Sequence, residues 1–105
     1  MAQINWTEPA LNDLNEIAEY IALDKPSAAK NLVKEIINSV KRLREFPESG
    51  RRPPELYDTR YRELIIGPCR IFYRVEEKLV FVLYVMRSER ELRKFILEDR
   101  ARLSS

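Results

Sequence analysis

Three strand-like runs follow one another closely in the second half of the chain, and they constrain the fold more than any other feature. They span residues 61 to 66, 69 to 75 and 79 to 86, and each is rich in β-branched and aromatic side chains. Gly67-Pro68 separates the first two runs and Glu76-Glu77-Lys78 separates the last two. Connections this short leave no room for a crossover, so the runs predict an antiparallel meander.

The first half of the chain predicts a short strand and two helices. Gln3 to Trp6 alternates polar and apolar residues and leads into Thr7, a favourable N-cap. Apolar residues at three- and four-residue spacing then predict a helix over roughly residues 8 to 23. Lys25-Pro26 interrupts this pattern and begins a second, long helix, which we expect to end near Phe46-Pro47.

Two further segments complete the predicted chain path. Residues 48 to 58 contain adjacent prolines and predict an ordered connection, whereas the tail from Ser88 predicts a terminal helix. A length of 105 residues is typical of one domain. We therefore predict a single α+β domain over residues 1–105, with a helical hairpin packed on an antiparallel sheet and the element order β-α-α-β-β-β-α.

The two faces of the predicted sheet differ in chemistry. In the middle run Arg70, Phe72 and Arg74 point to one side, so arginines lie among apolar groups on that face. The last run is apolar at nearly every position, as expected of a strand covered on both sides. Two helices can cover one of these sides, so we expect something else to cover the other.

Arginine dominates the basic residues of the chain. The net charge is +2, and 13 of the 19 basic residues are arginine. Residues 51 to 105 carry 13 basic and 9 acidic side chains, so the second half is the basic one. An arginine cluster could bind an anion or stabilise a phosphate during cleavage, and its candidate members are Arg60, Arg62, Arg70, Arg74 and Arg87.

An ordinary surface role competes with that interpretation. Cross-strand pairing with Glu63, Glu76 and Glu77 explains Arg60, Arg62 and Arg74 equally well, because opposite charges on neighbouring strands attract. Arg70 and Arg87 differ, since they lie within or at the end of the most apolar strands. An unpaired charge there is costly without a partner.

The residue inventory excludes several kinds of chemistry. The chain has no histidine, which removes the commonest general base and the usual transition-metal ligand. Its one cysteine, Cys69, cannot form an internal disulfide, and we interpret it as a small buried residue. We interpret Tyr20 as a packing residue, and we expect no metal and no cofactor.

The location of the protein is predicted from the same inventory. The single cysteine and the lack of a leader-like N-terminus favour the cytoplasm. The longest apolar stretch, residues 79 to 86, is far shorter than the ~20 residues that a membrane-spanning helix needs. We therefore expect no membrane association.

Several strings of the sequence, in order, resemble the ParE/RelE toxin superfamily over nearly the whole chain. They include Ile4-Asn5-Trp6-Thr7, Asp13-Leu14, Tyr20-Ile21-Ala22, Pro26-Ser27-Ala28-Ala29, Phe46-Pro47-Glu48-Ser49-Gly50, Tyr61-Arg62-Glu63, Arg70-Ile71-Phe72-Tyr73-Arg74 and Val85-Met86-Arg87. The resemblance implies a toxin of a type II toxin–antitoxin system, of the plasmid-stabilisation type. It also implies a cognate antitoxin that wraps the helical hairpin, lies along the sheet and supplies any contact with DNA.

Within this superfamily, the resemblance leaves two targets open. Messenger RNA endonucleases of the RelE type act on the ribosome with basic residues and a C-terminal Tyr or His; Arg70 and Arg87 match two of the basic positions. The region after Arg87 has neither Tyr nor His. The hairpin strings look more like the ParE branch, whose members bind DNA gyrase, so we favour a gyrase inhibitor without catalytic residues. A decayed, harmless binding module is a third alternative.

The resemblance and the surface pattern together give a set of predicted partner-binding residues. The set combines the apolar stripe of the first helix, the arginine-bearing strand face and the tail: Leu14, Ile17, Ile21, Arg62, Arg70, Phe72, Arg74, Arg87, Leu92 and Phe95.

Overall fold

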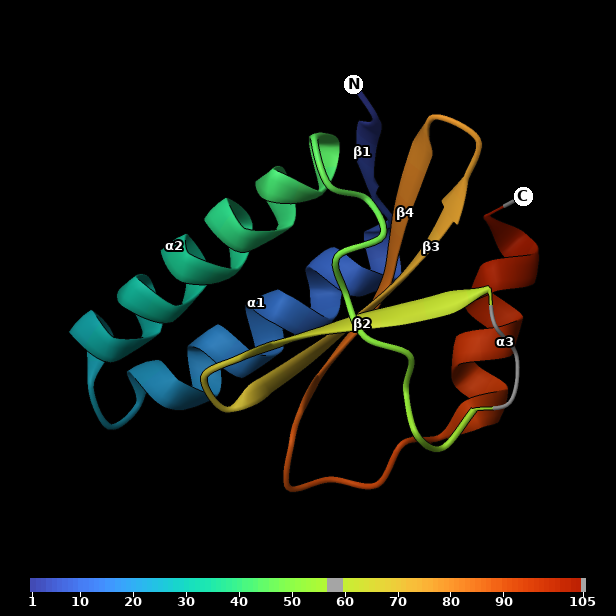
Figure 1. Cartoon of the computed structure of the whole chain (residues 1–105). Helices are drawn as coiled ribbons and strands as arrows, with labels where there is room; N and C mark the ends of the chain where they lie inside the picture. Colours follow the sequence, from blue (N-terminus) through green and yellow to red (C-terminus); the bar gives the residue numbers. More distant parts are fainter. Residues whose placement is uncertain (57–59, 105) are drawn as a thin grey trace.

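Four strands form one sheet with helices on both faces in the computed structural model, which describes residues 1–56 and 60–104 (Figure 1). The elements are β1 (Gln3–Trp6), α1 (Glu8–Ala22), α2 (Pro26–Lys41), a 3-10 turn η1 (Arg42–Arg44), β2 (Tyr61–Ile66), β3 (Cys69–Glu76), β4 (Leu79–Arg87) and α3 (Lys94–Leu103). This sequence of elements confirms the predicted α+β order. The last two residues of the predicted connection, 57 and 58, lie outside the described residues.

The sheet is mixed, with strand order β1-β4-β3-β2. The predicted meander is confirmed, because β2 pairs antiparallel with β3 and β3 pairs antiparallel with β4. β1 joins the far side of β4 in parallel, with Ile4 opposite Val80. This parallel pair is possible because the helical hairpin and β2 and β3 separate the two strands in the chain.

Thr7 fixes the corner between β1 and α1. Its hydroxyl donates to the carbonyl of Val82 at 2.7 Å and accepts from the backbone N–H of Ala10 at 3.4 Å. The first contact ties the corner to β4 and the second caps the helix. α2 begins at Pro26 as predicted, but it ends at Lys41 and tightens into η1, rather than continuing to Phe46-Pro47.

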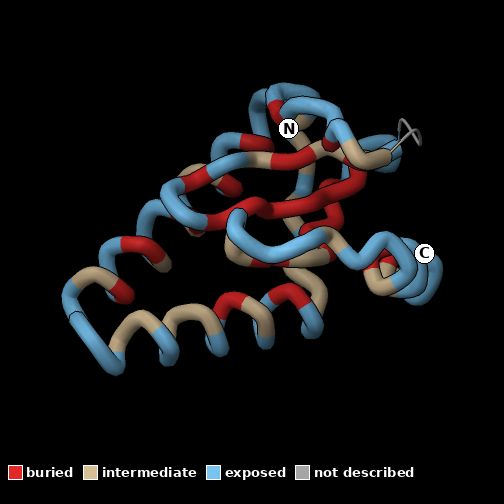
Figure 2. The backbone as a smooth tube through the Cα atoms, turned by 90° about the horizontal axis from the view of Figure 1, so that it is seen from below, coloured by how far each residue is buried: buried red, intermediate tan, exposed pale blue. Residues whose placement is uncertain are grey.

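The helical hairpin of α1 and α2 covers one face of the sheet and buries the larger core. Figure 2 shows the strands as the most continuously buried part of the chain. The fully or nearly fully buried members of this core come from both helices and the three long strands: Ala10, Leu14, Leu32, Ile36, Val40, Leu43, Ile66, Cys69, Ile71, Tyr73, Val80, Val82 and Val85.

The opposite face is covered by the chain itself. α3 lies on the other side of the sheet from the hairpin (Figure 1) and buries Leu97 and Ala101. These two residues belong to a second core with Phe72, Phe81 and Leu83. The additional cover predicted from the apolar last strand is therefore supplied by α3. The tail begins as a loop, and its helix starts at Lys94 rather than near Ser88.

A β-bulge interrupts the alternation of side chains along β4. The register shifts between Phe72, which lies opposite Tyr84, and Tyr73, which lies opposite Val82. Leu83 is therefore the extra residue of β4, and a bulge changes the alternation of side chains. Val82 and Val85 belong to the core under the hairpin, whereas Leu83 belongs to the core under α3.

Among the described residues, no helix is both long and apolar enough to cross a membrane.

Candidate partner-binding site

Arg70 lies at the centre of a network of four charged side chains, of which Arg70 and Glu63 are buried. Its Nε and Nη2 donate to Glu63 Oε2 at 3.1 and 2.6 Å. Its Nη1 and Nη2 donate to the two carboxylate oxygens of Glu55 at 2.6 and 2.7 Å. Arg51 completes the network, because its Nε donates to Glu63 Oε1 at 2.6 Å. We call these residues, Arg51, Glu55, Glu63 and Arg70, the Arg70 network.

The Arg70 network corrects the prediction that Arg70 is an unpaired charge. Two guanidinium groups and two carboxylates balance in charge, and 10% of the Arg70 side chain is exposed. The ion pair with Arg70 lowers the pKa of Glu55 below its usual value and raises the pKa of Arg70 further. Both groups therefore stay ionised at neutral pH, and the network is stable because each charge has an opposite charge beside it.

Arg74 is also paired inside the protein. Its Nη1 donates to the carbonyl of Ala101 at 2.9 Å, near the C-terminal end of α3. A second nitrogen, Nη2, lies 3.2 Å from a carboxylate oxygen of Glu76, so the pair forms within β3 and not across strands as predicted. The guanidinium lies 4.9 Å from the centre of the Phe81 ring. Arg74 therefore holds α3 on the sheet and is not exposed to a partner.

Arg62 holds the connection after α2 against the sheet. Its Nη1 donates to the carbonyls of Glu48 and Gly50 at 3.0 and 2.9 Å. The hydroxyl of Tyr73 donates to Pro47 and accepts from the N–H of Gly50, both at 2.9 Å. A Cβ atom at Gly50 would lie 2.5 Å from that hydroxyl, so no larger residue fits there without rearrangement. Among the described residues, Arg62 thus bonds to backbone carbonyls and not to one of the glutamates predicted for cross-strand pairing.

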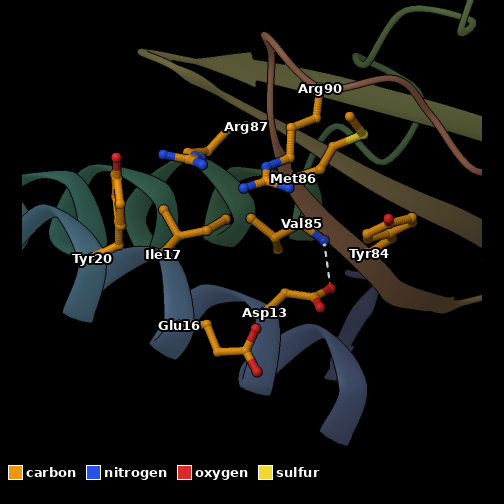
Figure 3. Close-up of a pocket in the computed structure, with 9 residues that line it drawn as sticks. All are labelled: Asp13, Glu16, Ile17, Tyr20, Tyr84, Val85, Met86, Arg87 and Arg90. Carbon is orange, nitrogen blue, oxygen red and sulfur yellow. Dashed lines mark hydrogen bonds between the residues drawn. The ribbon is translucent and has the colours of Figure 1, made fainter.

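An open cleft of about 350 Å³ lies between α1 and the end of β4 (Figure 3). We call it the α1–β4 cleft; it is lined by Asp13, Glu16, Ile17, Tyr20, Tyr84, Val85, Met86, Arg87 and Arg90. The Arg87 guanidinium lies 4.3 Å from the centre of the Tyr20 ring, and its Nε lies 3.2 Å from Glu89. Tyr20 itself is 59% exposed. The cleft therefore holds an arginine–aromatic pair in which Tyr20 is exposed and the Arg87 side chain is 18% exposed.

Asp13, which lines this cleft, forms an ion pair with Arg100 of α3. Arg100 Nη1 donates to Asp13 Oδ2 at 2.6 Å and to the carbonyl of Leu83 at 3.0 Å. The same carboxylate oxygen accepts from the backbone N–H of Val85 at 3.0 Å, as Figure 3 shows. Asp13 therefore satisfies a backbone donor of β4 and joins α1 to α3.

The apolar residues predicted to bind a partner differ in accessibility. Leu14 and Phe72 are buried in the two cores, so neither offers surface to a partner in this conformation, which corrects both predictions. Ile17, Ile21 and Leu92 are partly buried against these cores. Phe95 is 69% exposed on α3. Ile17 and Phe95 thus remain accessible, and Ile17 also lines the α1–β4 cleft.

Four functional candidates were not predicted from the sequence. Tyr20, interpreted as a packing residue, is exposed and stacked on Arg87. Glu55 lies in the turn-rich connection, where nothing in its neighbours signals a distant arginine. Asp13 and Arg100 are 87 positions apart in the chain. A periodic pattern on one element cannot reveal contacts of this kind, because they depend on how elements pack.

No group of three or more metal-binding side chains occurs among the described residues. Cys69 is completely buried, and burial raises the pKa of its thiol to about 11, so the thiolate is scarce at neutral pH. This environment agrees with its prediction as a small core residue.

Comparison with known proteins gives a consistent result. A family model described as the ParE toxin of the type II toxin–antitoxin system parDE matches residues 4–92 and ends before α3. A toxin named Y4kP from Sinorhizobium fredii is 39% identical over 89 residues, which cover 85% of this chain and 91% of that protein. Toxin RelE2 from Caulobacter vibrioides is 34% identical over 91 residues, which cover 86% of this chain and 99% of that protein.

A solved structure agrees with these sequence matches. The chromosomal ParDE toxin–antitoxin system from P. aeruginosa contains a chain that superposes with a TM-score of 0.70 at 29% identity. The match covers 85% of this chain and 98% of that one.

Proposed function

Because the chain belongs to the ParE toxin family of type II toxin–antitoxin systems, we propose that it inhibits DNA gyrase by binding it. We propose further that a cognate antitoxin neutralises the toxin. The similar P. aeruginosa chain comes from a ParDE toxin–antitoxin system, which supports an antitoxin as partner. The choice of gyrase rests on the arrangement of the arginines.

The state of Arg70 is the observation that carries this proposal. Cleavage of RNA requires cations that are free to approach the reacting phosphate. The Arg70 guanidinium instead donates to Glu55 and to Glu63, and the network around it has no net charge. A phosphate at Arg70 would have to displace a carboxylate first. This arrangement supports inhibition by protein binding rather than by RNA cleavage.

The α1–β4 cleft is the surface that we propose for the target. Arginine and tyrosine are enriched in protein interfaces, because they combine a large contact area with hydrogen-bonding groups. Arg87 and Tyr20 provide this combination at the mouth of the cleft. The partner-binding set proposed for the target therefore includes Ile17, Tyr20, Arg87 and Arg90.

One observation favours the alternative, a ribosome-dependent mRNA endonuclease. The phenol ring of Tyr20 lies beside Arg87 in an open cleft that also contains Glu16 (Figure 3). A phenol can transfer a proton, so Tyr20 could replace the tyrosine or histidine that the tail lacks. The name of the relative RelE2 also agrees with this alternative.

A supercoiling assay with purified gyrase tests the proposal. The wild-type chain in stoichiometric excess is expected to block supercoiling and to trap cleaved DNA, and Arg87→Ala is expected to lose this effect. Arg93→Ala is the matched control, because Arg93 is exposed and lies outside the cleft. Unchanged supercoiling at excess wild-type toxin would reject gyrase as the target.

A translation assay tests the alternative in parallel. An endonuclease would cut translated RNA at fixed positions within codons, and both Arg87→Ala and Tyr20→Phe would abolish the cuts. Cleavage that persists in Tyr20→Phe would exclude Tyr20 as the proton-transferring group. If wild-type toxin affects neither gyrase nor translated RNA, and growth is normal without antitoxin, the chain is a binding module without toxicity.

A further inference from the structure

We infer that the outward side of Arg70 is a carboxylate-binding site that Glu55 fills from within the chain, and that an acidic side chain of a protein partner binds there by displacing Glu55. The Arg70 network has an inner layer, formed by Glu63 and Arg51, and an outer layer, formed by Glu55, and the inference follows from this division. It rests on partner binding by this toxin family, and it does not require gyrase to be the target.

The inner layer of the network is part of the sheet and is closed to ligands. Glu63 belongs to β2 and its side chain is completely buried. Arg51 and Arg70 each occupy one of its two carboxylate oxygens. Arg51 is fixed further because its backbone N–H and carbonyl pair with those of Glu63 at 3.0 and 2.8 Å. These contacts persist when Glu55 leaves.

The outer layer is Glu55 alone, and it is easier to remove. Its side chain is 34% exposed, and Arg70 is its one side-chain partner among the described residues. It lies in a turn that follows Pro53-Pro54, outside the strands. The two parallel hydrogen bonds at 2.6 and 2.7 Å are the bidentate geometry with which arginine binds carboxylates in general. Arg70 therefore presents a preformed fork to any carboxylate that can reach it.

The charge balance determines which ligand replaces Glu55. With Glu55 in place, two positive and two negative groups cancel; without it, the network carries one positive charge. A single carboxylate restores neutrality and reproduces the two parallel hydrogen bonds that Glu55 accepts from Arg70. A negatively charged group that neutralises a buried guanidinium is strongly favoured over an empty site.

The residue after Glu55 further limits which partner segment fits the site. Leu56 follows Glu55 and packs against the core that contains Tyr61 and Phe72. When Glu55 moves away, Leu56 moves with it or loses this contact, and apolar surface becomes exposed. A replacement that buries both groups must carry an acidic residue next to an aliphatic one. The occupant that fits is an acidic–aliphatic segment of a protein partner.

Chemical rescue of Glu55→Ala tests the site directly. Acetate is the probe, and the Arg70 Nε–H signal in a nitrogen–proton NMR spectrum is the readout. We expect a saturable shift in Glu55→Ala, with a dissociation constant about tenfold lower than in the wild type. Sodium chloride at equal ionic strength is the control for screening.

Two results of this titration would overturn the inference. Equal shifts in Glu55→Ala and the wild type would mean that Glu55 does not occupy the site. Saturation by inorganic phosphate without saturation by acetate would mean that the site selects phosphate, as for a nucleic acid, and would contradict a protein carboxylate as the ligand.

The affinity for the cognate antitoxin tests whether a partner carboxylate displaces Glu55. Glu55→Gln removes the competing charge with little change in shape, so we expect the variant to bind the antitoxin about fivefold more tightly than the wild type. Glu45→Gln is the matched control, because Glu45 is exposed and forms no ion pair within the described part of the chain. Unchanged or weaker binding in Glu55→Gln would contradict displacement of Glu55 by the antitoxin. Because gyrase is absent from this measurement, its outcome is independent of the gyrase proposal.

Discussion

The role of each arginine on the sheet depends on the acceptors around its guanidinium. Arg70 and Arg74 lie on the same face of β3 with Phe72 between them, yet Arg70 is paired with two carboxylates and Arg74 with a helix-end carbonyl and Glu76. Both are more than nine-tenths buried, and a buried cation is tolerated because it has such partners. Arg87, at the end of β4, keeps its guanidinium beside Tyr20 at the cleft. Of these three arginines, Arg87 has the most exposed side chain, at 18%, and its ion-pair partner Glu89 is itself exposed.

The pKa of Glu55 predicts how this pairing responds to pH. Because the ion pair with Arg70 lowers the folded-state pKa of Glu55, the pairing stabilises the protein above the unfolded-state pKa of about 4.3. This stabilisation is lost as the pH falls through the lower, folded-state pKa. We therefore expect the excess stability of the wild type over Glu55→Gln to be present at pH 7 and to shrink toward pH 3. Urea unfolding of both proteins at a series of pH values measures this difference in stability.

The same series with Glu45→Gln separates this pair from general charge effects. Glu45 is exposed, so its substitution should change stability little at any of these pH values. A difference between wild type and Glu55→Gln that grows as the pH falls would contradict the assigned ion pair.

At the level of whole elements, α3 completes the fold by covering the second face of the sheet. Leu97 is fully buried in the core with Phe72, Phe81 and Leu83, whereas Phe95 on the same helix is 69% exposed. The carbonyl of Ala101 accepts from Arg74, so a polar contact fixes the C-terminal end of the helix. The matched family model ends at residue 92, so this cover is an element outside the matched region.

Substitutions on α3 measure how firmly it is docked. Leu97→Ala should lower the free energy of unfolding by about 2 to 5 kcal/mol, because it leaves a cavity in a closed core. Phe95→Ala is the control on the same helix and should change the free energy of unfolding by less than about 0.5 kcal/mol. Urea unfolding compares the two. Similar small effects for both would mean that α3 does not pack on the sheet in solution.

For the whole molecule, Asp13 and Arg100 connect three elements that are far apart in the sequence. Their ion pair joins α1 to α3, and each partner also bonds a backbone group of β4. The side chains are 16% and 20% exposed, so the pair is screened less than a surface pair. The hairpin layer, the sheet and α3 are thereby held together at the cleft.

A double-mutant cycle tests this connection. Asp13→Ala and Arg100→Ala should be coupled by about 1 to 3 kcal/mol in unfolding free energy, because they share buried hydrogen bonds. The exposed pair Asp99 and Arg102, on α3 alone, serves as the control and should be coupled by less than about 0.5 kcal/mol. Equal coupling in the two pairs would show that the Asp13–Arg100 contact does not bind the layers together.

The sequence by itself determined the elements of this protein and their order. Runs rich in β-branched and aromatic residues, separated by short turns, located β2, β3 and β4 to within one residue, and Thr7 and Pro26 marked the beginnings of α1 and α2. Such signals are local, because they depend on residues within a turn or a few positions.

The tertiary structure decided which residues are available for function. It buried Leu14 and Phe72, gave Arg70 its two carboxylates and brought Tyr20 to Arg87. Contacts between distant segments depend on packing in three dimensions, so no local pattern in the chain specifies them.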